Sequence, residues 1–431
     1  MVTSMKCFTA YHRVIAQVLL TSLTMFVTSP TAFAIVVDGQ NAMDAFGQTD
    51  DSLSAPSPIF TKGTANNASY KLGLNTPTMG IVMDTVNHRL FVSDTSNHRV
   101  LEYDLNSSNQ ITDRIPDHVI GQYNFYTNAS ANRVYGLNTP QGLAYDATNS
   151  RLFVSESAGN RVKIFDVASI TDGEDAINIL GQAGFTTTAA GTTQTGLNVP
   201  QGIAYDPTTK RLFVAQSTAN RVSVYTFTTG IVNGMNAVDE VGQFDDSLTA
   251  PQPIFTNSTA NNGPNKLGLH TPTIGLAMDT VNHRLFVTDT SNYRILEYDL
   301  DSSNNLLDRI PDHVLGEANF YTRASNTTQA GVNLPDGLSY DEINQRLFVA
   351  DTSNNRILIF DVTSITDGEN AINVLGQSSF TTTTAATTQA GLNVPTGVYY
   401  DSARGYLFVA QNTGNRVTVF DVNTITNGEN A

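Results

Sequence analysis

The chain has 431 residues, of which 23 are Lys or Arg and 39 are Asp or Glu, so its formal net charge is −16 at pH 7. This acidic balance argues against nucleic acid and anionic membrane surfaces as partners, because both are bound through clustered basic side chains. The single cysteine, Cys7, excludes a disulfide framework within the chain.

Residues 1–34 have the pattern of a secretory signal peptide. Basic residues precede an apolar run, Val14–Val27, and Ala32–Ala34 supplies the small residues of a cleavage site. The apolar run is too short to cross a bilayer as a helix, although an uncleaved N-terminal anchor is the alternative interpretation. We therefore expect a periplasmic or secreted protein that has no membrane association after cleavage.

One stretch recurs six times after this segment. In its second copy, Leu143–Val167, it reads LAYDATNSRLFVSESAGNRVKIFDV, and the copies align across this block without a gap. Self-similarity at a fixed register is the signature of a repeat architecture. An Asp ends the first apolar run of every copy. These anchor residues are Asp84, Asp146, Asp206, Asp279, Asp341 and Asp401.

Each copy predicts a four-stranded antiparallel meander. In the second copy the strands are expected at 142–146, 151–155, 161–167 and 176–182, where β-branched and aromatic runs alternate with Asn, Asp, Gly and Ser. Both faces of the second strand are apolar, which is typical of a sheet that is packed on both sides. Such sheets stacked around an axis form a β-propeller, so the sequence predicts an all-β fold of six blades.

The six units fall into two halves of three. The spacing Asp279 − Asp84 is 195 residues, and the other two equivalent pairs of anchors have the same spacing. The blocks Ile81–Leu105 and Leu276–Leu300 differ at only five of 25 positions. The chain is therefore interpreted as a tandem duplication of three blades.

The ring is expected to close with a strand from the N-terminal side. The last copy stops at Asn427–Ala431, where other copies continue into a fourth strand, and Asp38–Gln48 matches the missing segment. A strand at 42–48 would complete the last blade and remove two exposed sheet edges. The expected domains are the signal peptide at 1–34 and one propeller at 35–431, with tandem halves at about 38–232 and 233–431.

Long loops rich in Thr, Asn, Ala and Gly connect each unit to the next, as in Phe185–Gln201. Meander topology places these loops on the same side of the ring as the turns between second and third strands. We call this side the loop-rich rim. Because loops on a rigid scaffold usually carry binding, we expect the ligand to meet this rim.

Two tyrosines follow a recurrent Phe in the first unit of each half, and they point to a peptide- or sugar-binding surface. Packing is the alternative role, since a Tyr ring buries readily while its hydroxyl stays in water. Two histidines are expected on the same rim. The candidate ligand-binding residues are Tyr126, Asn128, Tyr321, Arg323, His98 and His270.

A polar residue recurs ten positions after each anchor Asp, and four of the six are acids. Converging carboxylates would suit Ca²⁺, which prefers oxygen ligands. These candidate metal ligands are Asp94, Glu156, Asp289 and Asp351.

The structural alternative is that each acid pairs with an Arg five residues later, which recurs in every copy and so favours a scaffolding role. These structural-repeat residues are Arg99, Arg161, Arg221, Arg294, Arg356 and Arg416. A zinc site would need about three clustered histidines, and no such spacing is present. We therefore expect no cofactor, and Ca rather than Zn if a metal is bound.

The repeat resembles the NHL-repeat family in the pattern LNxPxGLAYD…RLFVADTSNNRVLIFDV, most closely at Leu334–Val362. The likeness covers residues 36–431. Val374–Phe380 resembles the segment that precedes each repeat in extracytoplasmic bacterial members. The resemblance implies a six-bladed propeller but not one function, because the family includes protein- and RNA-binding modules, sensor domains and a peptide-amidating lyase with a channel metal.

No serine nucleophile elbow, phosphate loop, CxxC pair or dinucleotide fingerprint is visible in the sequence. Our first hypothesis is an extracytoplasmic binding or scaffold propeller that recognises a protein, peptide or glycan partner on its loop-rich rim. The alternative is a metal-dependent lyase or lactonase with its site in the central channel, so enzymatic activity stays open although the motifs argue against it. A purely structural role is the third hypothesis.

Overall fold

The computed structural model describes residues 38–50, 52, 54–65, 73–77, 80–245, 251–260, 268–272 and 275–423. The expected signal peptide lies outside these residues. By its internal contacts the chain divides into Met1–Ile35 and Val36–Ala431, and the second unit contains everything described below. Within the described ranges, no helix has the length and apolar character needed to cross a membrane.

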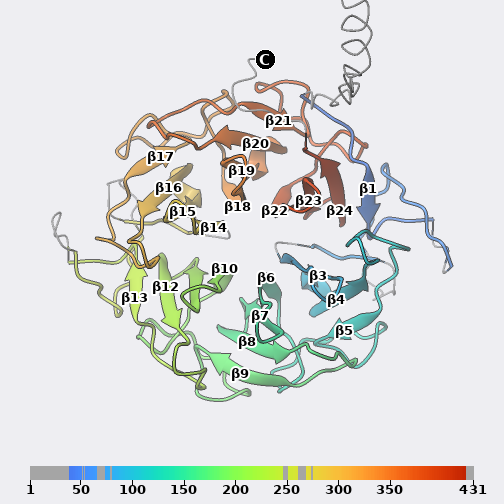
Figure 1. Cartoon of the computed structure of the whole chain (residues 1–431), viewed down its shortest axis with the longest axis horizontal. Helices are drawn as coiled ribbons and strands as arrows, with labels where there is room; N and C mark the ends of the chain where they lie inside the picture. Colours follow the sequence, from blue (N-terminus) through green and yellow to red (C-terminus); the bar gives the residue numbers. More distant parts are fainter. Residues whose placement is uncertain are drawn as a thin grey trace, which may run out of the picture. The chain divides into compact units, whose positions relative to one another are not determined.

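Six four-stranded antiparallel sheets form a ring around a central axis (Figure 1). In five of them the strand order follows the chain, and the sixth is ordered β1-β24-β23-β22. This arrangement confirms the predicted all-β propeller of six blades and its closure by an N-terminal strand.

The bounds of the strands are as follows. Blade 1 contains β2 (Ile81–Asp84), β3 (Arg89–Asp94), β4 (Arg99–Asp104) and β5 (His118–Ile120). Blade 2 contains β6 (Pro140–Asp146), β7 (Arg151–Glu156), β8 (Arg161–Asp166) and β9 (Ala176–Leu180). Blade 3 contains β10 (Pro200–Asp206), β11 (Arg211–Gln216), β12 (Arg221–Thr226) and β13 (Asp239–Val241).

The second half repeats this order. Blade 4 contains β14 (Leu276–Asp279), β15 (Arg284–Asp289), β16 (Arg294–Asp299) and β17 (His313–Leu315). Blade 5 contains β18 (Pro335–Asp341), β19 (Arg346–Asp351), β20 (Arg356–Asp361) and β21 (Asn373–Leu375). Blade 6 contains β22 (Pro395–Asp401), β23 (Tyr406–Gln411), β24 (Arg416–Asp421) and β1 (Asp44–Phe46). Short 3₁₀ turns η1 (Thr95–Asn97), η2 (Thr290–Asn292) and η3 (Thr352–Asn354) follow β3, β15 and β19.

The closing strand β1 is shorter than the predicted 42–48 and pairs antiparallel with β24, with Phe46 opposite Val417. In Figure 1 the blue β1 lies beside the red β24, at the outer edge of blade 6. Phe46 is completely buried and stacks on Phe408, with ring centroids 6.4 Å apart. The contact explains the closure, since burying a Phe stabilises a fold by about 1.5–3 kcal/mol.

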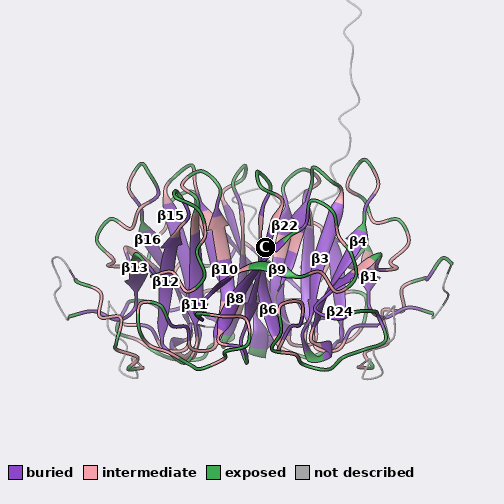
Figure 2. Cartoon of the chain, turned by 90° about the horizontal axis from the view of Figure 1, so that it is seen from below, coloured by how far each residue is buried: buried purple, intermediate pink, exposed green. Residues whose placement is uncertain are grey.

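The core lies between the blades rather than within one of them. A cluster of buried residues joins Phe91 and Val100 of blade 1 to Leu152 and Val154 of blade 2, and similar clusters lie at the other seams. Both faces of the second strands are therefore buried, as predicted. Figure 2 shows the strands buried along most of their length, with exposed residues mainly in the turns and loops at their ends.

Candidate functional site

Buried arginines anchor the loops of the loop-rich rim. All six repeat arginines are inaccessible to solvent. Each donates from Nη1 to the backbone carbonyl of a recurrent Phe in a loop, as Arg99 does to Phe125 at 2.6 Å and Arg294 to Phe320 at 2.7 Å. The other pairs are Arg161 with Phe185, Arg221 with Phe255, Arg356 with Phe380 and Arg416 with Phe60. The loops are thus fixed to the blades through their main chain.

The four candidate metal ligands are partners of these arginines. Nε of the arginine lies 2.7 Å from Asp94, 2.7 Å from Asp289 and 2.6 Å from Asp351, and Arg161 pairs with Glu156 in the same way. Asp94 also accepts from the Asn75 N–H at 2.7 Å and from Asn97 Nδ2 at 2.9 Å. Each acid belongs to a different blade. Within the described residues, no group of three metal-ligating side chains includes any of them. The geometry therefore favours the structural alternative at these positions.

The central channel is lined by the first strands of all six blades and has a volume of about 270 Å³. Its wall is mainly aliphatic and aromatic, with Leu143, Ile203, Leu338 and Tyr399 among the lining residues. None of the described lining residues is His, Asp, Glu or Cys. The described part of the channel wall thus holds no ligand set of the kind that a metal-dependent lyase or lactonase, the alternative hypothesis, would need.

A hydrogen bond from a side chain to the main chain, which we call the latch, joins five of the six blades to the next on the loop-rich rim. The residue that ends the turn between second and third strands adopts a left-handed conformation, with φ of 52° at His98. In five blades its side chain accepts an N–H from the loop that enters the next blade, at 2.8–3.0 Å. The acceptors are His98, Asn160, Asn220, Asn355 and Asn415, and the donors are Thr139, Val199, Thr271, Val394 and Thr76, respectively.

His98 is therefore engaged in the latch through Nδ1. Burial lowers the pKa of its imidazole, which keeps the ring neutral and able to accept. The sequence analysis predicted ligand binding for His98. The structure instead gives the side chain the same contact that asparagine makes in the sister blades.

Blade 4 departs from this latch. Tyr293 occupies the latch position. Its side chain has no hydrogen-bond acceptor near the main chain, unlike the Asn or His side chains of the sister blades. Its ring lies under Arg323, whose guanidinium carbon is 5.9 Å from the ring centroid. Nε of Arg323 donates to the Ser291 carbonyl at 2.8 Å, so the loop after β17 is tied to the turn after β15. A cation–π pair replaces the latch.

Two further residues of blade 4 change together with Tyr293. Among the residues that the structure describes, the buried Nδ1 of His270 has no hydrogen-bond partner, and burial followed by the charge of Arg323 lowers the pKa of this imidazole. Glu317 occupies the position where blade 1 has Gln122, which donates to the carbonyls of His98 and Ala129 at 3.0 and 2.9 Å. The carboxylate of Glu317 instead accepts the N–H of Ala324.

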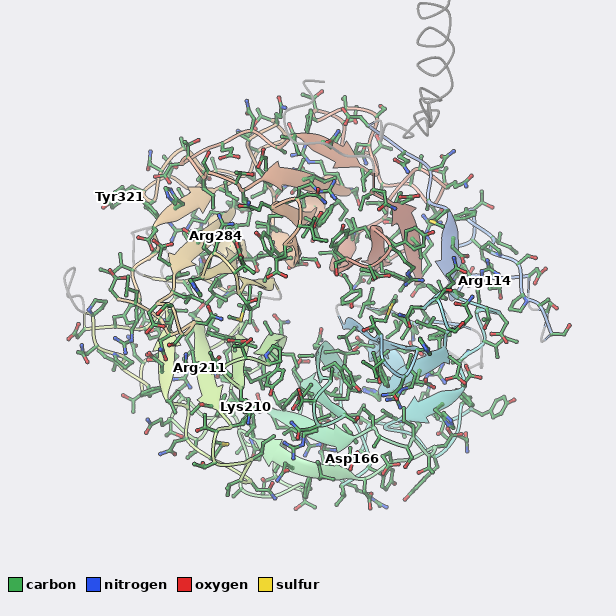
Figure 3. All side chains as sticks on the ribbon, viewed as in Figure 1. Arg114, Asp166, Lys210, Arg211, Arg284 and Tyr321 are labelled. Carbon is green, nitrogen blue, oxygen red and sulfur yellow. The ribbon has the colours of Figure 1, made fainter. Side chains whose placement is uncertain are left out.

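The two candidate tyrosines are largely exposed, at 70 % for Tyr126 and 69 % for Tyr321. They follow β5 and β17, which lie on opposite sides of the ring in Figure 1. Figure 3 shows Tyr321 at the outer edge of the ring, pointing away from the axis. The predicted single surface is thus split into two.

The six candidate residues consequently form a blade 1 group and a blade 4 group. The blade 1 group is Tyr126, Asn128 and His98, and the blade 4 group is Tyr321, Arg323 and His270. Sequence reasoning missed Tyr293 and Glu317. The signal for both was present in the repeat alignment, because each replaces an Asn, His or Gln that the other five copies have at that position.

Comparison with solved structures finds propeller-like proteins of low sequence identity. The chain is similar to an auxiliary nutrient binding protein from Bacteroides thetaiotaomicron, with 14% identity, a TM-score of 0.50, and coverage of 83% of this chain and 74% of that chain. A protein of unknown function from the same organism has 15% identity, a TM-score of 0.49, and coverage of 81% and 70%. No protein family and no curated protein matches the chain. At 14% identity the likeness to the nutrient binding protein shows the fold alone.

Proposed function

We propose that the chain is an extracytoplasmic binding propeller of the NHL-repeat type, and that the loop-rich rim of blade 4 recognises a protein, peptide or glycan partner. The observation that carries the proposal is the coordinated change at this rim. His270, Tyr293, Glu317 and Arg323 all differ from their counterparts in blade 1, although the strands below them are nearly identical. Changes that a scaffold does not need indicate selection for another task.

The chemistry of this rim suits a ligand with both a flat apolar face and acidic or hydroxyl groups. Tyr293 and Tyr321 supply aromatic surface, which sugars and peptides use for stacking. Arg323 adds a cation that lies against the Tyr293 ring, where stacking holds the guanidinium flat and oriented.

The location and the role as a binding protein rest on other grounds. The pattern of residues 1–34 supports export from the cytoplasm. A solved structure of similar fold is described as an auxiliary nutrient binding protein, which agrees with binding as the task of such a ring. The described channel wall, with its aliphatic and tyrosine side chains, gives the alternative, a channel enzyme, no comparable support.

The test is binding to arrays of acidic and neutral oligosaccharides and of peptides. The purified protein is compared with Tyr321→Ala/Arg323→Ala and with the matched blade 1 variant Tyr126→Ala/Asn128→Ala. We expect the blade 4 variant to lose at least tenfold in signal on the strongest spots and the blade 1 variant to keep it. No bound spot for the wild-type protein, or equal signal for both variants, would contradict the proposal.

A further inference from the structure

The third strands of blades 1 and 4 each bury a glutamate in the seam to the next blade. Glu102 on β4 and Glu297 on β16 are 0% and 1% exposed. The other four blades have an aliphatic residue at the same strand position. These residues are Ile164, Val224, Ile359 and Val419. The fold therefore accommodates an apolar side chain at this strand position, so packing alone does not explain the glutamates.

A second carboxylate replaces an apolar residue beside each glutamate. Asp117 and Asp312 immediately precede β5 and β17. The residues at this position in the other four blades are Ile177, Val238, Ile372 and Met43. Both acids therefore occur together in blades 1 and 4, whereas the other four blades have apolar residues at both positions.

The two acids meet a third carboxylate. Ligand oxygens of Glu102, Asp104 and Asp117 lie within 4.8 Å of one another, and those of Glu297, Asp299 and Asp312 do the same. The main chain fixes this geometry, since the Asp104 N–H donates to Asp117 Oδ2 at 2.8 Å and the Asp117 N–H donates to the Glu102 carbonyl at 2.8 Å. The corresponding bonds in blade 4 are 2.9 and 2.8 Å.

Within the described residues, the buried glutamate accepts no hydrogen bond. Both carboxylate oxygens of Glu102 and both of Glu297 lack a hydrogen bond. The nearby cationic groups are engaged elsewhere, because Arg89 pairs with Asp84 at 2.6 Å and His118 lies 3.5 Å from Asp172. Burial, and then the neighbouring aspartates, raise the pKa of Glu102 and of Glu297 to about 8. A buried carboxylate aimed at two others is a site that lacks its counter-charge.

We propose that each half of the propeller binds one divalent cation, Ca²⁺ in preference to Mg²⁺, between Glu102, Asp104 and Asp117 and between Glu297, Asp299 and Asp312. Three carboxylates supply up to six hard oxygen atoms, and Ca²⁺ takes six to eight such ligands in flexible geometry. Asp104 and Asp117 are exposed, so an ion enters from solvent and water completes its coordination. The cation neutralises the buried glutamate and joins β4 to β5.

The test is isothermal titration calorimetry of the full chain after treatment with EDTA, with CaCl₂ and MgCl₂ as titrants. We expect two Ca²⁺ per chain, with Kd on the order of 10⁻⁴ to 10⁻³ M as in extracellular modules, and weaker Mg²⁺ binding. Glu102→Gln and Glu297→Gln should each leave one ion, and the double variant none. Absence of Ca²⁺ binding by the wild-type protein, or tighter binding of Mg²⁺, would overturn the proposal.

Two further variants keep the result decisive. Asp166→Asn changes the blade 2 counterpart of Asp104 (Figure 3), whose neighbours are aliphatic, and should retain both ions. Glu102→Ile/Glu297→Ile installs the residue that blades 2 and 5 already bury, so it should fold, bind no Ca²⁺ and show no rise in Tm with CaCl₂. Two ions bound by this double variant would refute the assignment of the site.

Discussion

Blades 1 and 4 are the first units of the two halves, and they share their framework but not their rim. In both, the anchoring Arg lies 2.7 Å from its Asp and donates to the loop Phe carbonyl. In both, a first-turn histidine contacts an asparagine at 2.6 Å, and three carboxylates gather at the outer strands. These shared features are what the scaffold and its proposed cations require.

The rims of the same two blades differ at many loop positions, and four of these lie at the latch or beside it. Blade 1 has Asn75, His98, Gln122 and Asn128, and blade 4 has His270, Tyr293, Glu317 and Arg323. His98 and Gln122 make the latch and amide contacts that the sister blades make, whereas Tyr293 and Glu317 do not. Comparison of two near-identical units thus separates residues kept for folding from residues changed for another purpose.

Removing the shared Arg–Asp pair should lower the free energy of unfolding by the same amount whether the change is made in blade 1 or in blade 4. Arg99→Ala and Arg294→Ala each leave a buried Asp without its counter-charge, which costs about 3–5 kcal/mol in the free energy of unfolding. Urea denaturation measures this loss. The exposed Arg133 provides the control, since Arg133→Ala should change stability by less than about 0.5 kcal/mol. A clear difference between the two anchor variants would contradict the equivalence of the blades.

The shared acidic clusters should make stability fall as pH rises when metal is absent. The pKa of Glu102 and Glu297 is about 8 in the folded protein against 4.5 in the unfolded chain, with Asp104, Asp117 and Arg89 facing Glu102. Between these values the folded state holds more protons, so the free energy of unfolding decreases from about pH 5 to pH 8, by roughly 2–3 kcal/mol for each glutamate.

Urea denaturation in EDTA across this pH range tests that slope. Glu102→Gln/Glu297→Gln should flatten it, and CaCl₂ should reverse it, because the ion binds the ionised carboxylate. A slope that is unchanged in the double variant would show that other groups are responsible.

Removing the latch of blade 1 should have a smaller effect. His98→Ala leaves the Thr139 N–H without its acceptor, which costs about 1–1.5 kcal/mol. His98→Asn restores the acceptor that four sister blades use and should recover most of the stability. If both variants unfold at the same urea concentration, the latch has no energetic role.

Restoring the latch of blade 4 should stabilise the protein slightly. Tyr293→Asn introduces an acceptor for the Leu334 N–H and a residue that tolerates the left-handed φ of 56°. We expect a gain of about 0.5–1 kcal/mol in the free energy of unfolding, measured against the wild-type protein. A loss of stability would mean that the Tyr293–Arg323 stack itself holds the rim together.

The sequence predicted what the repeat makes periodic. Strand order, the closing strand and the pairing of Arg99 with Asp94 all follow from spacings that recur in every copy. The sequence did not predict which atom each arginine contacts besides its repeat partner. The loops are held by Phe carbonyls rather than by buried Phe rings alone, and Arg221 turns to Glu240, 3.2 Å away on β13, because Gln216 offers no charge.

The sequence predicted the candidate site only in part, because some of its features do not recur in every copy. Exposed Tyr126 and Tyr321 follow from loop position, but the ring geometry places them on opposite blades. Tyr293 and Glu102 are informative only by contrast with the sister blades, where asparagine, histidine or aliphatic residues occupy their positions. A column-by-column comparison of the repeats reveals such exceptions, whereas motif searching along the chain does not.

The most direct test of the rim hypothesis is to convert blade 4 into blade 1 at the four rim positions. The variant His270→Asn/Tyr293→His/Glu317→Gln/Arg323→Asn is compared with the wild-type protein on the same oligosaccharide and peptide arrays, with Tm measured in parallel. We predict an equal or higher Tm and at least a tenfold loss of binding, which corresponds to about 1.4 kcal/mol. Undiminished binding by this folded variant would contradict the account, because the rim of blade 4 would then be no more than a variation of the scaffold.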